Sequence, residues 1–388
     1  METSGRFLQF QTGSFFLFGP RGTGKSTWLR PLRDSAVWID LLDPEAFRLF
    51  QARPERLAER VAGQPQAVDV VIDEVQKVPA LLNVVHSLVE GERPLRFILT
   101  GSSARKLRRG AANLLAGRLT ELPMHPFMAA ELGDTFNLQR ALEMGLVPLI
   151  WSAAEPEQTL RAYASLYLQE EVQAEALVRD VGAFARFLEA ISFSYGALLN
   201  LAEVARECQV GRKTVEGYLE ILEDLLLSFR VPVFTRRAQR HLVAHDKFYF
   251  FDTGVYRSIR PTGPLDSVQE IESMALEGLV AQHLRAWSSY RNVPAELFYW
   301  RTKSGSEVDF VVYGADVFVA IEVKRSRLVH ATDLRALKAF QEDYPEATVC
   351  LLYMGKEELK INGVLCLPCE QFLRHLHPQN ELFSMDIT

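Results

Sequence analysis

A glycine-rich segment near the N-terminus constrains the fold of this chain more than any other feature. It reads Gly19-Pro20-Arg21-Gly22-Thr23-Gly24-Lys25-Ser26 and fits the pattern G-x-x-x-x-G-K-[ST]. The apolar residues 15–18 come before it, as a buried strand would, and a helix start is expected at about Thr27. A strand, a glycine-rich loop and a helix in this order form the phosphate-binding unit of a parallel α/β sheet. We therefore predict an α/β fold with a nucleotide site at the loop.

The residue types of this loop suit a nucleoside triphosphate. Its glycines let successive backbone N–H groups turn toward phosphates, and the following helix directs its positive end to the same point. Lys25 would reach the β- and γ-phosphates, and Ser26 would ligate magnesium. ATP and Mg²⁺ are therefore the predicted cofactors. The predicted binding residues are Gly19, Pro20, Arg21, Gly22, Thr23, Gly24, Lys25, Ser26, Thr27 and Asp73, with Ser26 and Asp73 serving the metal.

A carboxylate pair, Asp73 and Glu74, ends a second apolar run at residues 68–72. Ligands of open α/β folds bind at the carboxyl ends of the strands, so we predict that Asp73 holds the Mg²⁺ shell. The Glu74 side chain points away from that of Asp73, and we predict that it polarises the attacking water. Such a pair alone is more often a solvated strand end, but the glycine-rich loop makes the functional interpretation the stronger one.

A third apolar run, residues 95–99, ends in Thr100-Gly101-Ser102-Ser103. A polar side chain at this strand end could sense the γ-phosphate or orient the attacking water. The alternative is a Ser/Gly turn that caps the next helix. Thr100 and Ser102 are both candidates, and the sequence does not choose between them.

Arg118 is the candidate for an arginine that acts across a subunit interface. It follows the basic segment 104–109, and Gly117 beside it permits close approach of the backbone. An arginine donated by a neighbour neutralises charge on the transferred phosphoryl group. The alternative is a solvated basic helix with Arg118 in a structural ion pair. Because an arginine acting in trans requires a neighbour, a homo-oligomer is expected, either a ring or a partial ring, with a hexamer among the forms considered.

These motifs together resemble a known group. The loop at 19–26, the carboxylate pair after Ile72, the segment 99–103 and the segment 115–127 resemble the AAA-type ATPases that carry a C-terminal domain of unknown function, the AAA_14/DUF4143 architecture. The resemblance covers nearly the whole chain. It implies an α/β fold in which a P-loop AAA-type parallel sheet core, residues 1–150, precedes a helical and winged-helix domain, 151–255. A PD-(D/E)XK nuclease-like α/β domain, 256–388, would follow.

Composition agrees with two or three ordinary domains: the 388 residues are 48% hydrophobic and 24% charged. No run approaches twenty apolar residues, the chain start lacks the form of a signal peptide, and four cysteines argue against a disulfide framework. We expect a cytoplasmic protein that does not associate with membranes.

The net charge of -6 gives no overall attraction to nucleic acid, so DNA contact would depend on the basic patches at 105–118 and 236–241.

A helix-turn-helix is predicted at residues 201–222, with a break at 209–211, and the apolar segments 229–234 and 247–251 would complete a winged helix. Its second helix starts with Arg212, Lys213 and Thr214, where such modules reach bases and phosphates. Acidic residues follow on that helix and would repel a phosphate backbone that they faced. DNA contact and an internal or partner-docking role therefore both stay open.

The last third of the chain carries a second chemical pattern. Asp309, Glu322 and Lys324 fit the D…E-x-K spacing of PD-(D/E)XK nucleases, in which alternate strand residues share one face. The carboxylates would bind Mg²⁺ or Mn²⁺, and Lys324 would stabilise charge or orient water. The resemblance adds Glu277 as a further acid. An ion-pair ladder, or a nuclease fold that has lost its activity, is the alternative.

The predicted function is that of a Mg-dependent AAA-type ATPase that couples hydrolysis to action on a macromolecular client, with DNA as the expected client. The residues expected to carry catalysis are Lys25, Glu74, Thr100, Ser102 and Arg118. Two other functions compete with it. One is a nucleotide-operated protein-binding switch or scaffold with an inactive nuclease fold, and the other is a winged-helix DNA-binding regulator.

Overall fold

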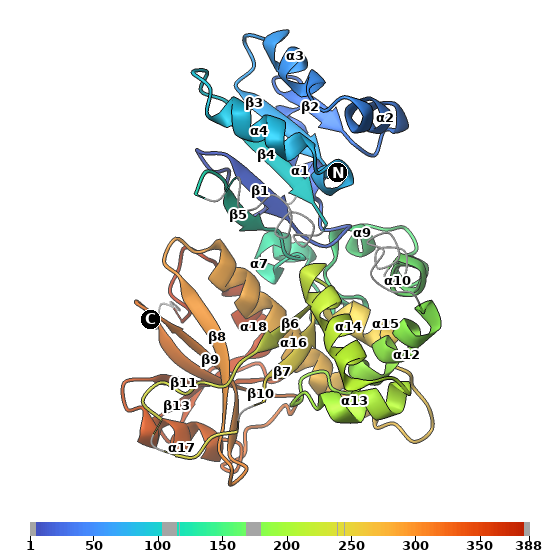
Figure 1. The fold of residues 1–388 in the computed structure, drawn as a ribbon. Helices are drawn as coiled ribbons and strands as arrows, with labels where there is room; N and C mark the ends of the chain where they lie inside the picture. The colour runs from blue at the N-terminus through green and yellow to red at the C-terminus, as the bar shows by residue number, and fades with distance from the viewer. Residues whose placement is uncertain are drawn as a thin grey trace. The chain divides into compact units, whose positions relative to one another are not determined.

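The computed structural model describes residues 5–102, 115, 117–167, 180–238, 240–243 and 245–383. Two compact units make up the chain (Figure 1). The first, here called the N-terminal unit, comprises Leu8–His125 with Leu222–Leu227. The second, the C-terminal unit, comprises Pro126–Ile221 and Ser228–Thr388 together with the segment that ends at Phe7. The finer division into three domains at residues 150 and 255 stays a prediction.

The N-terminal unit is built on a five-stranded sheet in the order β2-β3-β4-β1-β5. Its strands are β1 (Phe15–Phe18), β2 (Val37–Asp40), β3 (Asp69–Asp73), β4 (Arg96–Gly101) and β5 (Thr120–Pro123). All neighbouring strands run parallel. The predicted α/β fold with a parallel sheet core is confirmed. Strand β1 is buried along its whole length, as the apolar run at 15–18 predicted.

Short helices cover this sheet. They are α1 (Lys25–Leu29), the 3-10 turn η1 (Arg30–Leu32), α2 (Pro44–Ala52), α3 (Arg56–Ala62), the 3-10 turn η2 (Val75–Lys77) and α4 (Leu81–Val89). Asp43 begins α2, because its carboxylate accepts hydrogen bonds from the backbone N–H groups of Glu45 and Ala46. Phe50 of α2 and Phe97 of β4 are fully buried in one shared core, which joins this helix to the sheet.

The first part of the C-terminal unit is mostly helical. Its elements are α7 (Ala129–Leu132), the 3-10 turn η3 (Gly133–Thr135), α8 (Leu138–Met144), α9 (Pro148–Trp151), α10 (Pro156–Ala162), a π-helical turn (Tyr163–Tyr167), α12 (Val181–Ser192), α13 (Leu201–Cys208), α14 (Arg212–Asp224), β6 (Ser228–Val231), β7 (Lys247–Phe250) and α15 (Thr253–Ile259). Helix α13 ends at Cys208, and the residue after it, Gln209, has a φ of 57° that turns the chain toward α14.

Strands β6 and β7 pair antiparallel, but a tight turn does not join them. In the connecting segment, the backbone N–H of Phe234 donates to the carbonyl of Tyr299 at 2.7 Å, and that of Val243 donates to Arg301 at 3.2 Å. The segment therefore runs along strand β8 (Ala295–Arg301) of the following sheet. The Phe234 side chain is fully buried in the core of that sheet. The winged-helix assignment stays a prediction.

The second sheet has six strands in the order β12-β13-β11-β10-β9-β8. Its remaining elements are α16 (Val268–Tyr290), β9 (Glu307–Gly314), β10 (Phe318–Lys324), α17 (Arg335–Asp343), β11 (Thr348–Tyr353), β12 (Leu359–Ile361), β13 (Val364–Pro368) and α18 (Cys369–His375). Strands β10, β11 and β13 run parallel, whereas β8, β9 and β12 pair antiparallel with their neighbours. None of the helices described here is long and apolar enough to span a bilayer.

A register shift between β8 and β9 redirects the side chain of Asp309. Phe298 pairs with Val311 but Trp300 pairs with Val308, so β9 carries one extra residue at this point. Val308 and Val311 both lie in the core shared with α17, although a regular strand would place residues three apart on opposite faces. The bulge between them lets Asp309 leave this core and reach other partners.

Candidate nucleotide site and carboxylate cluster

The glycine-rich loop connects β1 to α1, the arrangement that the sequence predicted. Gly22 and Gly24 have φ angles of 81° and 93°. A residue with a Cβ atom adopts such angles only with strain, so glycine is favoured at both positions. Lys25, the first residue of α1, is buried, and its ammonium donates to the carbonyl of Gly19 at 2.6 Å and to that of Pro20 at 3.3 Å. The Lys25 ammonium therefore lies against the loop backbone, beside the N-terminus of α1.

Gly19 is required by close packing. A Cβ atom at this position would lie 2.5 Å from the carbonyl oxygen of Met124 and 2.9 Å from the Thr23 hydroxyl. The Thr23 hydroxyl in turn donates to the carbonyl of Pro20 at 2.8 Å. The chain after β5 thus packs directly on the start of the loop and holds its path.

Asp73 connects the loop to two strand ends. It is buried at the last position of β3, and the Ser26 hydroxyl donates to its Oδ2 at 2.8 Å. The Thr100 hydroxyl, fully buried on β4, donates to the Oδ1 of Asp73. The two predicted magnesium ligands, Ser26 and Asp73, are therefore in direct contact. Oxygen ligands of this kind are those that Mg²⁺ prefers.

Glu74 takes an uncommon backbone conformation, with a φ of 59° in the left-handed region. This conformation costs a residue with a side chain roughly 1–2 kcal/mol. The Thr100 hydroxyl accepts a hydrogen bond from the Glu74 N–H at 3.1 Å. The Thr100 hydroxyl thus contacts the side chain of Asp73 and the backbone of Glu74.

Gln76 belongs to this group, although the sequence analysis did not select it. Its amide Nε2 donates to Glu74 Oε2 and, at 3.1 Å, to the hydroxyl of Ser102. Its nearness in sequence to Glu74 could be read, but the turn that brings its side chain back to Glu74 could not. The structure therefore separates the two sensor candidates, because Thr100 contacts Asp73 while Ser102 reaches Glu74 through Gln76.

Arg118 forms an ion pair with Glu90, with Nε 2.5 Å from Oε1. Both side chains are partly exposed, at 38% and 52%. The hydrogen bond from Arg118, and then its charge, hold the pKa of Glu90 below its usual value. An ion pair within the chain is the alternative role considered for Arg118 above. The role of Arg118 across a subunit interface stays a prediction. Ser103 and the basic residues Arg105, Lys106, Arg108 and Arg109 lie outside the described residues.

Residues 11–133 match the family model of an AAA domain, and residues 272–372 match that of a domain of unknown function, DUF4143. The chain therefore combines an AAA domain with a DUF4143 domain. Between these two regions, residues 135–266 match a further domain of unknown function, DUF8612. The AAA domain contains every residue predicted for the nucleotide site, and it supports nucleotide binding and an ATPase type of function.

Similar proteins include an uncharacterized protein of Mycobacterium tuberculosis, 24% identical over 368 residues, which cover 92% of this chain and 80% of the relative. An uncharacterized protein of Haemophilus influenzae is 22% identical over 397 residues, covering 92% and 94%. Among solved structures, replication initiator DnaA bound to AMPPCP and single-stranded DNA is 15% identical with a TM-score of 0.26, covering 57% of this chain and 84% of its own. Protein VC1899 from Vibrio cholerae is 12% identical with a TM-score of 0.21, covering 93% and 96%.

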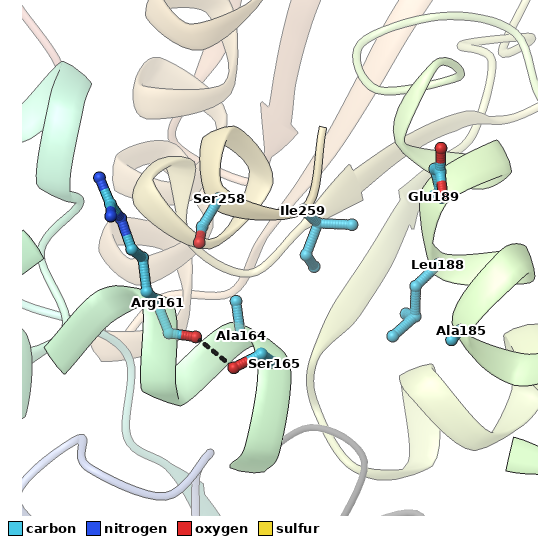
Figure 2. A pocket seen from close by; sticks show the side chains of 8 residues that line it. All are labelled: Arg161, Ala164, Ser165, Ala185, Leu188, Glu189, Ser258 and Ile259. Atoms are coloured by element: carbon cyan, nitrogen blue, oxygen red, sulfur yellow. Dashed lines mark hydrogen bonds between the residues drawn. The ribbon is translucent and has the colours of Figure 1, made fainter. Parts of the chain in front are cut away.

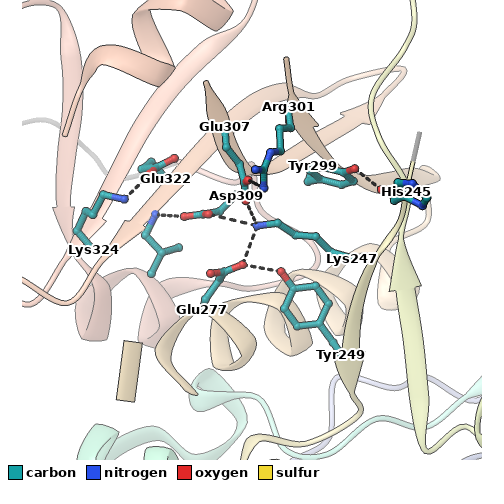
Figure 3. Close-up of polar contacts among 11 residues, drawn as sticks. His245, Lys247, Tyr249, Glu277, Tyr299, Arg301, Glu307, Asp309, Glu322 and Lys324 are labelled. Atoms are coloured by element: carbon teal, nitrogen blue, oxygen red, sulfur yellow. Dashed lines mark hydrogen bonds and ion pairs between the residues drawn. The ribbon is translucent and has the colours of Figure 1, made fainter. Parts of the chain in front are cut away.

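A buried lysine, Lys247, lies among three acidic residues of the C-terminal unit. The Lys247 ammonium, 1% exposed, lies 3.0 Å from Glu277 of α16 and 2.5 Å and 3.4 Å from Glu307 and Asp309 of β9 (Figure 3). The Tyr249 hydroxyl donates to Glu277 at 2.6 Å. Two of the four residues predicted for a nuclease site, Glu277 and Asp309, therefore meet at a cation that the sequence analysis did not select.

Burial and charge act in opposite directions in this cluster. Burial raises the pKa of Glu277 to about 7, although the neighbouring Lys247 lowers it. Burial alone would lower the pKa of Lys247, and the charges of Glu277, Asp309 and Glu307 reverse this effect and raise that pKa well above its usual value. Lys247 is therefore a charged ammonium that compensates buried carboxylates.

The other two predicted nuclease residues form an ion pair of their own, with Lys324 Nζ 2.5 Å from Glu322 Oε1. Glu322 is buried, and burial followed by the charge of Asp309 raises its pKa well above the usual value. Asp309 reaches the same strand, because its Oδ2 accepts from the N–H of Val323 at 2.9 Å. Among the described residues, no group of three or more His, Cys, Asp or Glu side chains is arranged to hold a metal ion.

Three of the basic residues proposed for DNA contact in the C-terminal unit have acidic partners. Arg240 donates to Glu342 and Asp343, both at 2.8 Å. Arg236 lies 2.9 Å from Glu296, and at the start of α14 Arg212 pairs with Glu216 at 2.9 Å. These pairs reduce the positive charge available to a phosphate backbone. DNA contact stays a prediction.

One pocket of about 300 Å³ lies in the helical part of the C-terminal unit (Figure 2). It is lined by residues of α10, the π-helical turn, α12 and α15, namely Arg161, Ala164, Ser165, Ala185, Leu188, Glu189, Ser258 and Ile259. The Ser165 hydroxyl donates to the carbonyl of Arg161 at 2.7 Å. No residue predicted for the nucleotide site or the nuclease site lines this pocket.

Proposed function

We propose that this protein is a magnesium-dependent ATP hydrolase. The observation that carries the proposal is the connection from the P-loop to the strand ends: Ser26 contacts Asp73, and Thr100 contacts both Asp73 and the backbone of Glu74. The P-loop residues 19–27 would bind the triphosphate, with Lys25 at the β- and γ-phosphates. Ser26 and Asp73 would hold Mg²⁺, which would neutralise phosphate charge when bound.

In the proposed reaction, Glu74 orients a water molecule and accepts its proton. The water oxygen forms a bond to the γ-phosphorus, and the bond from that phosphorus to the oxygen of ADP breaks. Thr100 supports this step by holding the Glu74 backbone. The Arg118 of a neighbouring subunit would stabilise the charge on the transferred group, which requires a homo-oligomeric ring or partial ring.

Two variants separate binding from hydrolysis. Lys25→Ala should weaken ATP binding itself, because it removes the ammonium at the loop. Glu74→Gln should keep ATP affinity and lose hydrolysis, because the amide cannot accept a proton. Nucleotide affinity and phosphate release would be measured on the same samples. Normal turnover by Glu74→Gln would refute the assignment of the base.

We propose DNA as the macromolecular client, on the basis of the helix-turn-helix pattern of α13 and α14. Linear and branched DNA should then stimulate phosphate release. Turnover that is independent of both would shift the assignment toward a protein client.

A mixing experiment tests whether Arg118 acts in a neighbouring subunit. Mixing Arg118→Ala with Glu74→Gln subunits should partly restore turnover only if Arg118 acts between subunits.

One observation favours a second candidate, a nucleotide-operated switch whose nuclease-like domain does not cleave. The Lys247 ammonium lies among Glu277, Glu307 and Asp309, where it competes with a divalent cation for the same carboxylates. Under this candidate, Asp309→Asn leaves ATP turnover intact, and the unaltered chain cleaves no DNA with Mn²⁺. Cleavage that Asp309→Asn abolishes would restore the nuclease assignment.

A further inference from the structure

Gln76 occupies a central position in the nucleotide site. It lies on η2, two residues after Glu74, and is 7% exposed. Its Nε2 donates to Glu74 Oε2 and to Ser102 Oγ. Because an amide nitrogen carries two hydrogens, these two contacts use both of them. The side chain therefore bridges the carboxylate of Glu74 and the end of β4.

The orientation of this amide is fixed by its partners. With the amide reversed, its carbonyl oxygen would face the carboxylate of Glu74, and two acceptors would oppose each other. In the orientation observed, the Oε1 of Gln76 is buried, and no described residue donates a hydrogen bond to it. The described contacts of this side chain are thus made by Nε2, toward Glu74 and Ser102. This favours a role for Gln76 beyond filling space.

Glu74 is consequently held at two points. Its backbone N–H donates to Thr100, and its carboxylate accepts from Gln76, which also reaches Ser102. Thr100 lies on β4, and Ser102 follows directly after Gly101, the last residue of that strand. One strand end thereby fixes both the left-handed backbone of Glu74 and the direction of its side chain.

We propose that Gln76 is a positioning residue for ATP hydrolysis, which fixes the carboxylate of Glu74 by bridging it to Ser102. This inference rests on the proposed hydrolase function and on Glu74 as its base. It assigns Thr100 and Ser102 different tasks. Thr100 holds Asp73 and the Glu74 backbone, whereas Ser102 acts on the Glu74 side chain through Gln76.

The variant Gln76→Met keeps the length of the side chain and removes the amide. We expect kcat to fall about 10- to 100-fold, the effect of losing a hydrogen bond to a charged group, while KM and ATP affinity stay unchanged. Gln76→Glu keeps the shape but places a carboxylate against that of Glu74, so its kcat should be the lowest. Gln51→Met makes the same chemical change at an exposed position of α2 and should match the unaltered chain.

A double variant tests the bridge itself. If Ser102 acts through Gln76, Gln76→Met combined with Ser102→Ala should be no slower than Gln76→Met alone, because both changes break one chain of contacts. Multiplying effects would show that the two residues act separately and would overturn the bridge.

The outcomes distinguish this inference from the proposed function. Full-length protein would be assayed for phosphate release across ATP concentrations. If the unaltered chain hydrolyses ATP in a Glu74-dependent way and Gln76→Met has the same kcat, the inference is wrong and the hydrolase assignment stands. A raised KM with unchanged kcat would also overturn it, because it would assign Gln76 to binding. Absence of Glu74-dependent hydrolysis would overturn both.

Discussion

Thr100→Val removes one hydroxyl that serves two partners, with little change in side-chain volume. The lost hydroxyl donates to the carboxylate of Asp73 and accepts from the N–H of Glu74, in a fully buried position. A hydrogen bond to a charged group contributes about 1.5–3 kcal/mol, and a buried N–H left without an acceptor costs about 1–3 kcal/mol. The lower ends of these ranges add to about 2.5 kcal/mol.

A free-energy change of this size corresponds to a roughly 60-fold change in an equilibrium constant. We therefore expect amide hydrogens of β3 and β4 in Thr100→Val to exchange with solvent faster by about that factor, which mass spectrometry can resolve for this unit alone. ATP turnover should fall at least about tenfold, because the left-handed backbone of Glu74 loses its anchor.

Thr100→Ser is the matched control, since it keeps the hydroxyl and loses only a methyl group. Its cost should be about 1 kcal/mol from the lost apolar contact. Exchange and turnover in Thr100→Ser should therefore stay close to those of the unaltered chain. If Thr100→Val and Thr100→Ser behave alike in both assays, the hydroxyl does not hold the two carboxylate residues and the reasoning fails.

Three further changes have expected outcomes. Gly24→Ala places a Cβ in open space at a φ of 93°, so backbone strain alone should weaken nucleotide binding roughly 5- to 30-fold in a titration. Arg118→Ala should slow turnover while Glu90→Ala does not; equal rates in the two variants would reduce Arg118 to a structural ion pair. Burial lowers the pKa of His283 to about 4 from 6.5, so the unfolded chain binds more protons between these values and stability is lost as pH falls through them. Compared with His283→Gln, the unaltered chain should lose about 3 kcal/mol more between pH 7 and 4 in denaturant titrations.

The nucleotide site could be predicted from the sequence because its signals are local. The loop at 19–26 is continuous, and the apolar runs that end at Asp73 and Thr100 are long enough to identify buried parallel strands. The carboxyl ends of such strands lie at one sheet edge. The sequence alone therefore predicts that Asp73 lies near Ser26, and the two side chains are hydrogen-bonded in the structure.

Gln76 was equally local and was still missed. Charged and hydroxyl side chains near the strand ends carried the prediction, and an amide is neither. Its role depends on a turn that brings it back to Glu74, and the left-handed φ of Glu74 that makes this turn has no sequence signal, because the residue is not glycine.

The carboxylate cluster shows a different limit. Glu277, Asp309, Glu322 and Lys324 were selected by spacing, but spacing could not show that Lys247 lies among them, since it is 30 residues from Glu277 and 62 from Asp309. The bulge that frees Asp309 from the α17 core is likewise set by pairing with β8. Glu307 was readable, because it is two residues from Asp309 on one strand.

The most direct test of the account is phosphate release from ATP and Mg²⁺ by the unaltered chain and by Glu74→Gln, purified and assayed side by side. The account predicts steady release by the unaltered chain and nearly none by Glu74→Gln, with equal ATP affinity in both. Equal release by the two proteins, or none by either at saturating ATP, would contradict it.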